Sequence, residues 1–287
     1  MKKTDFILYN GEKMPITDPV FGVTNRAIKF GDGFFESVLS YYEEVPFWGH
    51  HFERIKNAFY DYDMKTSTYS SKYLLNEILR LSKSNKFFGK VYTRISFFRE
   101  DTGKYAPKKD SRVSYFMEQR FLGQQTFEIN PKGLVLGCFT EYRKPVNRWS
   151  KYKKISADLF VFASMYSATY RFDDVFIVND KGKIIETTHS NIFCLNENGK
   201  VYTPAISSGC VAGVMRRVII DLLTNNSIEV VEVDGFEETD FEKAEELFLT
   251  NAIQGIKWVG AYKDKRFVKD LSVFLTEKLN TIYFNNL

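Results

Sequence analysis

Strand-like and helix-like segments alternate along the whole chain, and this alternation is what most limits its possible fold. Runs rich in aromatic and β-branched residues, such as 34–42 and 91–98, are typical of strands. Runs with apolar residues every three or four positions, such as 70–81 and 213–223, are typical of helices. Because both kinds recur from end to end, the sequence predicts a mixed α/β or α+β fold.

The same patterns predict the other elements. Further strands are expected at 6–9, 113–117, 133–139, 175–178, 183–186, 192–195, 201–202, 228–233 and 247–250, and further helices at 47–60, 159–170 and 274–282. Asn10-Gly11 and Asn198-Gly199 are turn pairs that favour hairpins. Ser70 or Ser71 is suited to cap the helix that follows.

The length of 287 residues suits one large domain or two ordinary ones. Between Glu118 and Pro131 the strand and helix patterns weaken, and 123–126 is polar. We therefore predict an N-terminal α/β domain over 1–120, a linker over 121–131 and a C-terminal domain over 132–287.

Charge and hydropathy argue against two classes of partner. The 40 basic and 36 acidic residues leave a net charge of +4, and basic residues form no stripe with interleaved aromatics, so no nucleic-acid partner is expected. No apolar run approaches the ~18 residues that a membrane-spanning helix needs. Asp5 precedes the first apolar run, which argues against a signal peptide. Small anionic substrates remain compatible with this charge.

Cysteine and histidine usage indicates a reduced compartment and no metal. The cysteines are odd in number and far apart, which favours the cytoplasm over a disulfide framework; they are Cys138, Cys194 and Cys210. The histidines have no zinc-ligand spacing; they are His50, His51 and His189.

Short motifs follow one another along nearly the whole chain. They lie at 31–36 (GDGFFE), 51–54 (HFER), 152–156 (YKKIS), 185–193 (IETTHSNIF), 202–204 (YTP), 213–216 (GVMR) and 246–252 (ELFLTNA). Their joint order and spacing resembles the class IV aminotransferases, the fold type IV pyridoxal-phosphate (PLP) enzymes. This family includes branched-chain aminotransferases and 4-amino-4-deoxychorismate lyases. The resemblance implies two α/β domains, PLP in the cleft between them, and a homodimer.

PLP chemistry requires a lysine that forms an imine with the cofactor. The resemblance assigns this catalytic role to Lys153, with Ser156 replacing an Asn of the family pattern. The same register places Val161 and Ala163 on helix positions that the family keeps apolar. Lys154, one residue on, is the alternative, although Lys153 would then occupy a hydrophobic slot.

The resemblance also implies residues that hold the cofactor. Glu186, followed by Asn191, matches the acid that pairs with the pyridine nitrogen, where an ionised carboxylate keeps that nitrogen protonated. Arg54 matches the main phosphate cation, since a guanidinium offers a planar fork to phosphate oxygens.

A helix start and a later loop complete the expected cofactor set. Gly213, Val214 and Met215 match a helix N-terminus whose backbone N–H groups face the phosphate. Asn251 and Ala252 match a further phosphate contact. The family more often has Thr at the Met215 position, and its branched-chain members tend to have Thr at the Ala252 position, so two hydroxyl contacts are expected to be missing.

The candidate substrate-binding residues are Phe35, Glu36, Arg94 and Arg148. Relatives use Arg or Lys at the Arg94 position near the substrate carboxylate, whereas the D-amino-acid group tends to use Tyr. Glu36 would line the pocket or cap the sheet edge, and Arg148 with Trp149 would close over the substrate. His50 and His51 are expected to position the helix that carries Arg54, since in this family the lysine itself moves the proton.

The resemblance leaves three functions open. The first is transamination of a small amino acid and 2-oxo acid pair through the Lys153 imine. The second is 4-amino-4-deoxychorismate lysis, which releases pyruvate and 4-aminobenzoate and belongs to folate biosynthesis. The third is a non-catalytic binding protein that kept the scaffold.

Overall fold

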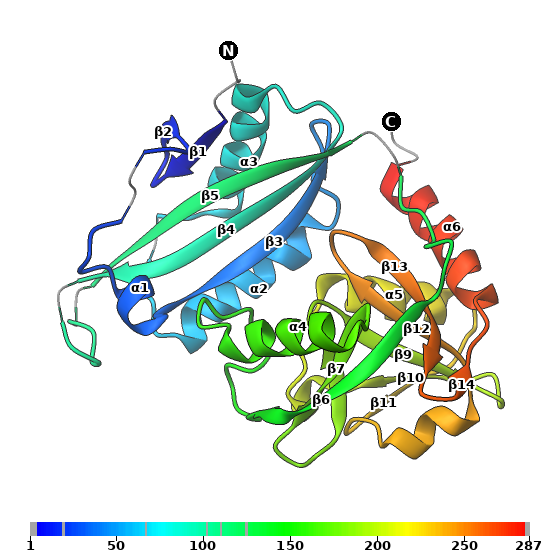
Figure 1. Cartoon of the computed structure of the whole chain (residues 1–287). Coiled ribbons are helices and arrows are strands. Elements are labelled where there is room, and N and C mark those ends of the chain that lie inside the picture. The colour runs from blue at the N-terminus through cyan, green and yellow to red at the C-terminus, as the bar shows by residue number, and fades with distance from the viewer. Residues whose placement is uncertain are drawn as a thin grey trace. The chain divides into compact units, whose positions relative to one another are not determined.

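The computed structural model describes residues 5–18, 21–66, 68–101, 103–109, 111–123 and 126–284. The chain forms two compact units (Figure 1). The first unit comprises Met1–Gln125 with Tyr152–Ser156, and the second comprises Thr126–Lys151 with Ala157–Leu287. The division falls inside the expected linker 121–131, of which Gln124 and Gln125 lie outside the described residues. The sequence-based boundaries place the Lys153 segment in the C-terminal domain, whereas its contacts group it with the first unit.

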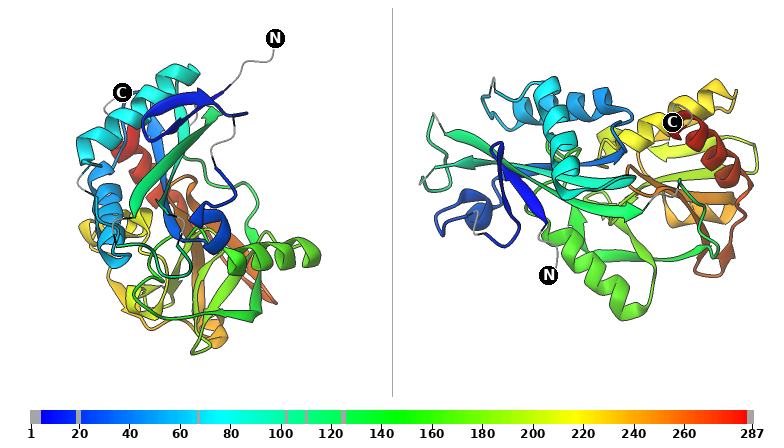
Figure 2. Two further views of the ribbon diagram at one scale, coloured as in Figure 1. Left: turned by 90° about the vertical axis from the view of Figure 1, so that its left-hand side faces the viewer. Right: turned by 90° about the horizontal axis from the view of Figure 1, so that it is seen from above.

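Within the described residues, the first unit has a five-stranded antiparallel sheet in the order β2-β1-β5-β4-β3. Its strands are β1 (Phe6–Tyr9), β2 (Glu12–Pro15), β3 (Gly33–Tyr41), β4 (Lys90–Glu100) and β5 (Arg112–Gly123). Its helices are α1 (Arg26–Phe30), α2 (Trp48–Asp61) and α3 (Ser71–Asn85). Figure 2 shows α2 and α3 on the same face of this sheet.

Local signals account for much of the first unit. The Asn10-Gly11 pair joins β1 to β2 as an antiparallel hairpin. Ser70 is the N-cap of α3, because its hydroxyl accepts a hydrogen bond from the Tyr73 N–H at 3.2 Å. Ile55 of α2 and Ile78 of α3 are fully buried in the core cluster that also contains β-strand residues of this unit. The helices therefore hold one face of the sheet out of water.

Over residues 126–284, the second unit has a nine-stranded mixed sheet in the order β11-β10-β9-β12-β13-β6-β7-β8, with β14 beside β13. Its strands are β6 (Leu134–Lys144), β7 (Asp174–Asn179), β8 (Ile184–Thr187), β9 (Asn191–Asn196), β10 (Val201–Pro204), β11 (Val230–Val233), β12 (Ala244–Asn251), β13 (Gly255–Tyr262) and β14 (Lys265–Arg266). Its helices are α4 (Asp158–Tyr170), α5 (Val214–Asn225) and α6 (Asp270–Phe284), with short 3₁₀ turns at Ile206–Ser208 and Glu238–Lys243.

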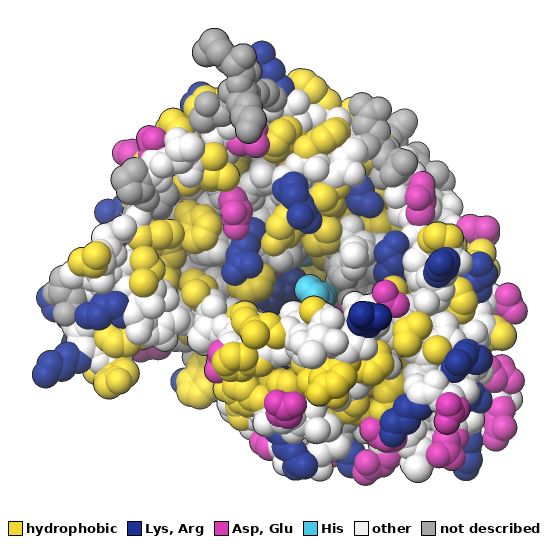
Figure 3. All heavy atoms as spheres, in the orientation of Figure 1, with side chains coloured by type: hydrophobic (Ala, Val, Ile, Leu, Met, Phe, Trp, Pro, Cys, Tyr) yellow, Lys and Arg dark blue, Asp and Glu magenta, His cyan; other side chains and the backbone are white. Residues whose placement is uncertain are grey.

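The structure adds to the expected elements. The segments α1, β2, β13 and β14 were not predicted, and β6 continues past residue 139 to Lys144. In α4, Ala163 is fully buried but Val161 is 54% exposed. Figure 3 shows hydrophobic side chains gathered over α4. Phe162 and Met165 of this helix are also exposed. No helix among the described residues is long and apolar enough to cross a membrane.

Candidate active site

The candidate lysine lies on a short segment that extends the sheet of the first unit. Lys154 forms an antiparallel bridge with Phe34 of β3, and the Phe35 N–H donates to the Lys153 carbonyl at 2.8 Å. The Ile155 N–H donates to the Gly33 carbonyl at 3.1 Å. Two such bonds fix the backbone on either side of Lys154 and so set the position of Lys153 relative to β3.

The two glycines of the 31–36 motif allow this segment to approach. A Cβ on Gly33 would lie 2.5 Å from the Ile155 Cδ1 and 2.3 Å from the Phe97 carbonyl oxygen. A Cβ on Gly31 would lie 2.6 Å from the Ser156 Cβ, and Gly31 has a φ of +61°. Larger residues at these positions would push the lysine segment away, which gives the motif a physical reason.

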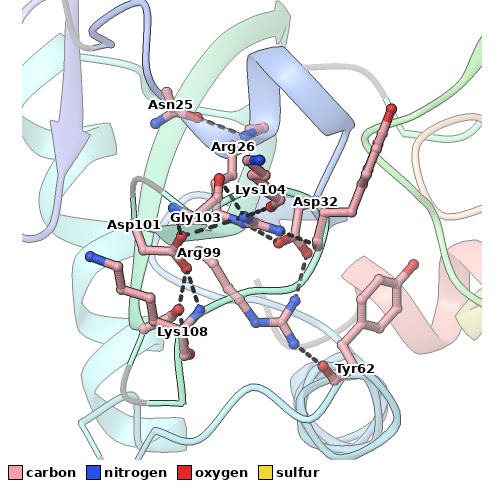
Figure 4. A network of polar contacts seen from close by, with 12 residues as sticks. Asn25, Arg26, Asp32, Tyr62, Arg99, Asp101, Gly103, Lys104 and Lys108 are labelled. Carbon is pink, nitrogen blue, oxygen red and sulfur yellow. Dashed lines mark hydrogen bonds and ion pairs between the residues drawn. The ribbon is translucent and has the colours of Figure 1, made fainter.

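The turn before β3 is held by a network of ion pairs within the first unit (Figure 4). Asp32 accepts hydrogen bonds from Arg26 Nε at 2.7 Å and from Arg99 at 2.5 Å. Arg26 is 1% exposed and also donates to the backbone carbonyls of Lys104 and Tyr105. Arg99, on β4, therefore helps to hold the motif turn.

The last residue of this motif, Glu36, is a buried carboxylate. Glu36 is 2% exposed, and its two oxygens accept bonds from Arg54 Nε at 2.9 Å and from a terminal nitrogen of Arg54 at 2.5 Å. The His51 Nδ1 lies 2.5 Å from the same carboxylate. His51 and Arg54 are one turn apart on α2, so a single carboxylate fixes both side chains.

The charges in this cluster shift its ionisation. Burial raises the pKa of Glu36, but Arg54 and then His51 outweigh it and bring the pKa from 4.5 to about 2. Burial lowers the pKa of His51, and Arg54 and Lys153 add to this effect against the bond to Glu36. The His51 Nε2 is buried and has no hydrogen-bond partner among the described residues. Glu36 is therefore an ionised partner of Arg54 and His51, and its expected place in the pocket or at the sheet edge stays a prediction.

Two further cations lie near the ring of Phe35, the residue before Glu36. The Arg94 guanidinium lies 3.6 Å from the centroid of the Phe35 ring, and the Lys153 Nζ lies 5.8 Å from the same centroid. Both distances allow a cation–π interaction. Three of the residues predicted from the sequence thus lie together, with the Arg94 side chain 31% exposed.

The second unit contains a cluster of its own around Glu186 of β8. Glu186 is 2% exposed, and it accepts bonds from the Lys144 Nζ at 2.5 Å and from the Val211 N–H at 2.8 Å. Lys144 ends β6 and is 5% exposed. The sequence did not single out Lys144, because the expected strand stopped five residues before it.

Asn191 supports the chain that leads into α5. Its Nδ2 donates to the Val211 carbonyl at 2.9 Å, and a Cβ on Gly213 would lie 2.0 Å from its Oδ1. Gly213 is the N-cap of α5 and has no side-chain capping bond. The first-turn N–H groups of an α-helix, here those of Val214 and Met215, have no partner within the helix, and they favour an anion.

The 251–255 turn lies next to this support. Asn251 donates to the Ser190 hydroxyl at 3.0 Å, and its Oδ1 accepts from the Ile253 and Gln254 N–H groups. Ala252 is 7% exposed.

Three of the predicted residues of the second unit are linked by hydrogen bonds, and Arg148 lies apart from them. Glu186, Asn191 and Gly213 are connected through Val211, which bonds to both Glu186 and Asn191. Arg148 is exposed, and its guanidinium lies 4.5 Å from the Trp149 ring centroid. Closure of Arg148 over a substrate therefore stays a prediction.

The first unit thus holds Lys153 beside a buried charge cluster, and the second unit holds a buried acid that is linked through Val211 to the start of α5. The amino-transferase class IV family model matches residues 33–261, and the chain belongs to this family. A putative branched-chain-amino-acid aminotransferase of Methanocaldococcus jannaschii is 25% identical over 96% of both chains. The aminodeoxychorismate lyase of Bacillus subtilis is 25% identical over 86% of this chain and 83% of its own length.

Solved structures show the same fold. The branched-chain amino acid aminotransferase of Thermobaculum terrenum, solved in its PLP form, superposes with a TM-score of 0.82 and 16% identity, over 100% of this chain and 96% of that chain. The mixed α/β fold with two sheets is therefore that of the fold type IV enzymes. Family membership makes the chain an enzyme and sets aside the non-catalytic binding protein.

Proposed function

We propose that this enzyme uses PLP to exchange an amino group between a small amino acid and a 2-oxo acid. The observation that carries the proposal is the position of Lys153. Its Nζ lies 5.8 Å from the Phe35 ring centroid, and its charge adds to the effect of burial in lowering the pKa of His51. Lys153 is thus beside charged side chains that hydrogen bonds hold in place, which suits a site that must position a reacting lysine.

The donor set fits PLP. Lys153 would form the covalent link, Glu186 would pair with the pyridine nitrogen, and the α5 N-terminus with Arg54 would bind the phosphate. The tight approach of the Asn191 side chain to Gly213 supports the last assignment, because it holds the start of α5 in a position that only glycine allows. When bound, the cofactor ring would withdraw electrons from the substrate carbon.

The remaining steps fall to the protein's own residues. Lys153, once displaced by the substrate amine, would take the proton of the α-carbon on its Nζ and return it. Arg94 would orient the substrate carboxylate, because its guanidinium lies over Phe35 and is partly exposed. Glu36 would hold Arg54 in place and would not itself touch the reacting atoms.

The lyase remains the second candidate, and the similarity to the Bacillus subtilis lyase favours it. A lyase needs cations for two carboxylates, for which Arg94 and Arg148 are the candidates. It would release pyruvate and 4-aminobenzoate from aminodeoxychorismate, without leaving the amine form of the cofactor.

One pair of assays separates the two. The purified, PLP-loaded enzyme is mixed with a panel of amino acids, and separately with aminodeoxychorismate. Transamination predicts that an amino acid alone bleaches the yellow colour and that 2-oxoglutarate restores it. Release of 4-aminobenzoate, with no bleaching by any amino acid, would decide for the lyase.

We further propose that the enzyme acts as a cytoplasmic homodimer. The exposed apolar residues of α4 support the dimer, because such a patch suits a partner surface. The three cysteines, all within the described part of the chain, are free thiols, which supports a reducing compartment such as the cytoplasm. Light scattering during gel filtration tests the dimer. A mass of one chain, 33.5 kDa, at micromolar concentration would contradict it.

A further inference from the structure

The Lys144–Glu186 pair is a deeply buried ion pair of the second unit. The side chains are 6% and 3% exposed, and their charged atoms lie 2.5 Å apart. The pair joins the end of β6 to β8, with β7 between these strands in the sheet. The Phe160 ring lies 5.6 Å from the Lys144 Nζ, so one side of the ammonium is apolar.

The second Glu186 oxygen is also engaged, by the Val211 N–H. The carboxylate therefore faces one full positive charge and one backbone dipole before any ligand binds. The nearby Cys210 adds no charge, because burial raises the pKa of its thiol to about 11. A third donor would have to share a carboxylate whose negative charge is already offset by Lys144.

We propose that Lys144 is a positioning residue that shares Glu186 with the pyridine nitrogen of PLP and weakens the hold of Glu186 on the proton of that nitrogen. The inference rests on the proposed function, because it requires Glu186 to serve PLP. Two cations that bond to one carboxylate lie about 5 Å apart. At that distance and an effective dielectric constant of about 20, their Coulomb repulsion shifts the protonation equilibrium of the pyridine nitrogen by a factor on the order of a hundred. Lys144 thereby tunes how strongly the ring can withdraw electrons.

The test is the ¹⁵N chemical shift of the pyridine nitrogen in enzyme loaded with ¹⁵N-labelled PLP, which reports protonation directly. Lys144→Met and Lys144→Gln both remove the charge, and the second keeps a hydrogen-bond donor if the first fails to fold. Both should move the signal toward the protonated position, with a roughly hundredfold change in the equilibrium. Lys144→Arg keeps the positive charge and should therefore give the same signal as wild type.

Lys183→Met is the matched control, because Lys183 precedes β8 and forms an exposed pair with Glu237. It should leave the signal unchanged. An identical ¹⁵N signal in wild type and in the charge-removing variants would overturn the proposal. A wild-type pyridine nitrogen that stays fully protonated over the whole pH range in which the enzyme is folded would also overturn it. Failure of the wild type to bind PLP at all would instead refute the proposed function.

Discussion

Replacing Glu36 by Gln should destabilise the protein at neutral pH but hardly at all in acid. The carboxylate is 2% exposed and bonds to Arg54 and His51. Its pKa falls from 4.5 to about 2 on folding, which corresponds to roughly 3 kcal/mol of stability. Because the folded pKa is the lower one, this contribution is complete above pH 4.5 and is lost as the pH falls toward 2. Removing one partner of a buried ion pair costs about 3–5 kcal/mol, which agrees in size.

Urea unfolding followed by tryptophan fluorescence measures this effect, since Trp48 lies on α2 itself. The free energy of unfolding of Glu36→Gln should be roughly 3 kcal/mol below that of wild type at pH 7, and the gap should shrink to about half or less by pH 3. Glu43→Gln is the control, because Glu43 and Lys83 form an exposed pair worth ~0–1 kcal/mol. A gap for Glu36→Gln that stays constant from pH 7 to pH 3 would refute the role of charge in this cluster.

Two further substitutions test the cofactor assignments. Arg54→Ala should remove a charge-assisted phosphate contact of roughly 1.5–3 kcal/mol and so weaken PLP binding about 10–150-fold. Equilibrium dialysis measures this affinity, and an unchanged value would show that Arg54 does not bind the phosphate. Gly213→Ala should lower both the melting temperature and the PLP affinity, because the added Cβ would lie 2.0 Å from the Asn191 Oδ1. Gly49→Ala is the control and should lower neither, because its Cβ would meet nothing within 4 Å.

The sequence predicted features whose causes are local. The Asn10-Gly11 hairpin and the Ser70 cap each depend on a few neighbouring residues, and both are present. The apolar spacing of α3 and α5 also identified those helices, because one face of each is buried. The family motifs predicted the lysine segment and the acid, and the glycines among them allow the close approach of the 152–156 segment to β3.

Features that depend on distant strands escaped prediction. The pairing of the Lys153 segment with β3 joins positions more than 100 residues apart, and nothing near Lys153 encodes it. Lys144 meets Glu186 only because β6 and β8 lie on either side of β7 in the sheet. The bonds from His51 and Arg54 to Glu36 likewise require α2 to pack beneath β3, which the spacing of charges along the chain does not specify.

The central claim is that Lys153 carries the cofactor, and borohydride trapping tests it most directly. The PLP-loaded enzyme is reduced, digested and analysed by mass spectrometry, in wild type and in the Lys153→Ala and Lys154→Ala variants. We expect one pyridoxyl group on Lys153, the loss of label and yellow colour in Lys153→Ala, and the retention of both in Lys154→Ala. A pyridoxyl group on Lys154, or on no lysine of the 152–156 segment, would contradict the account.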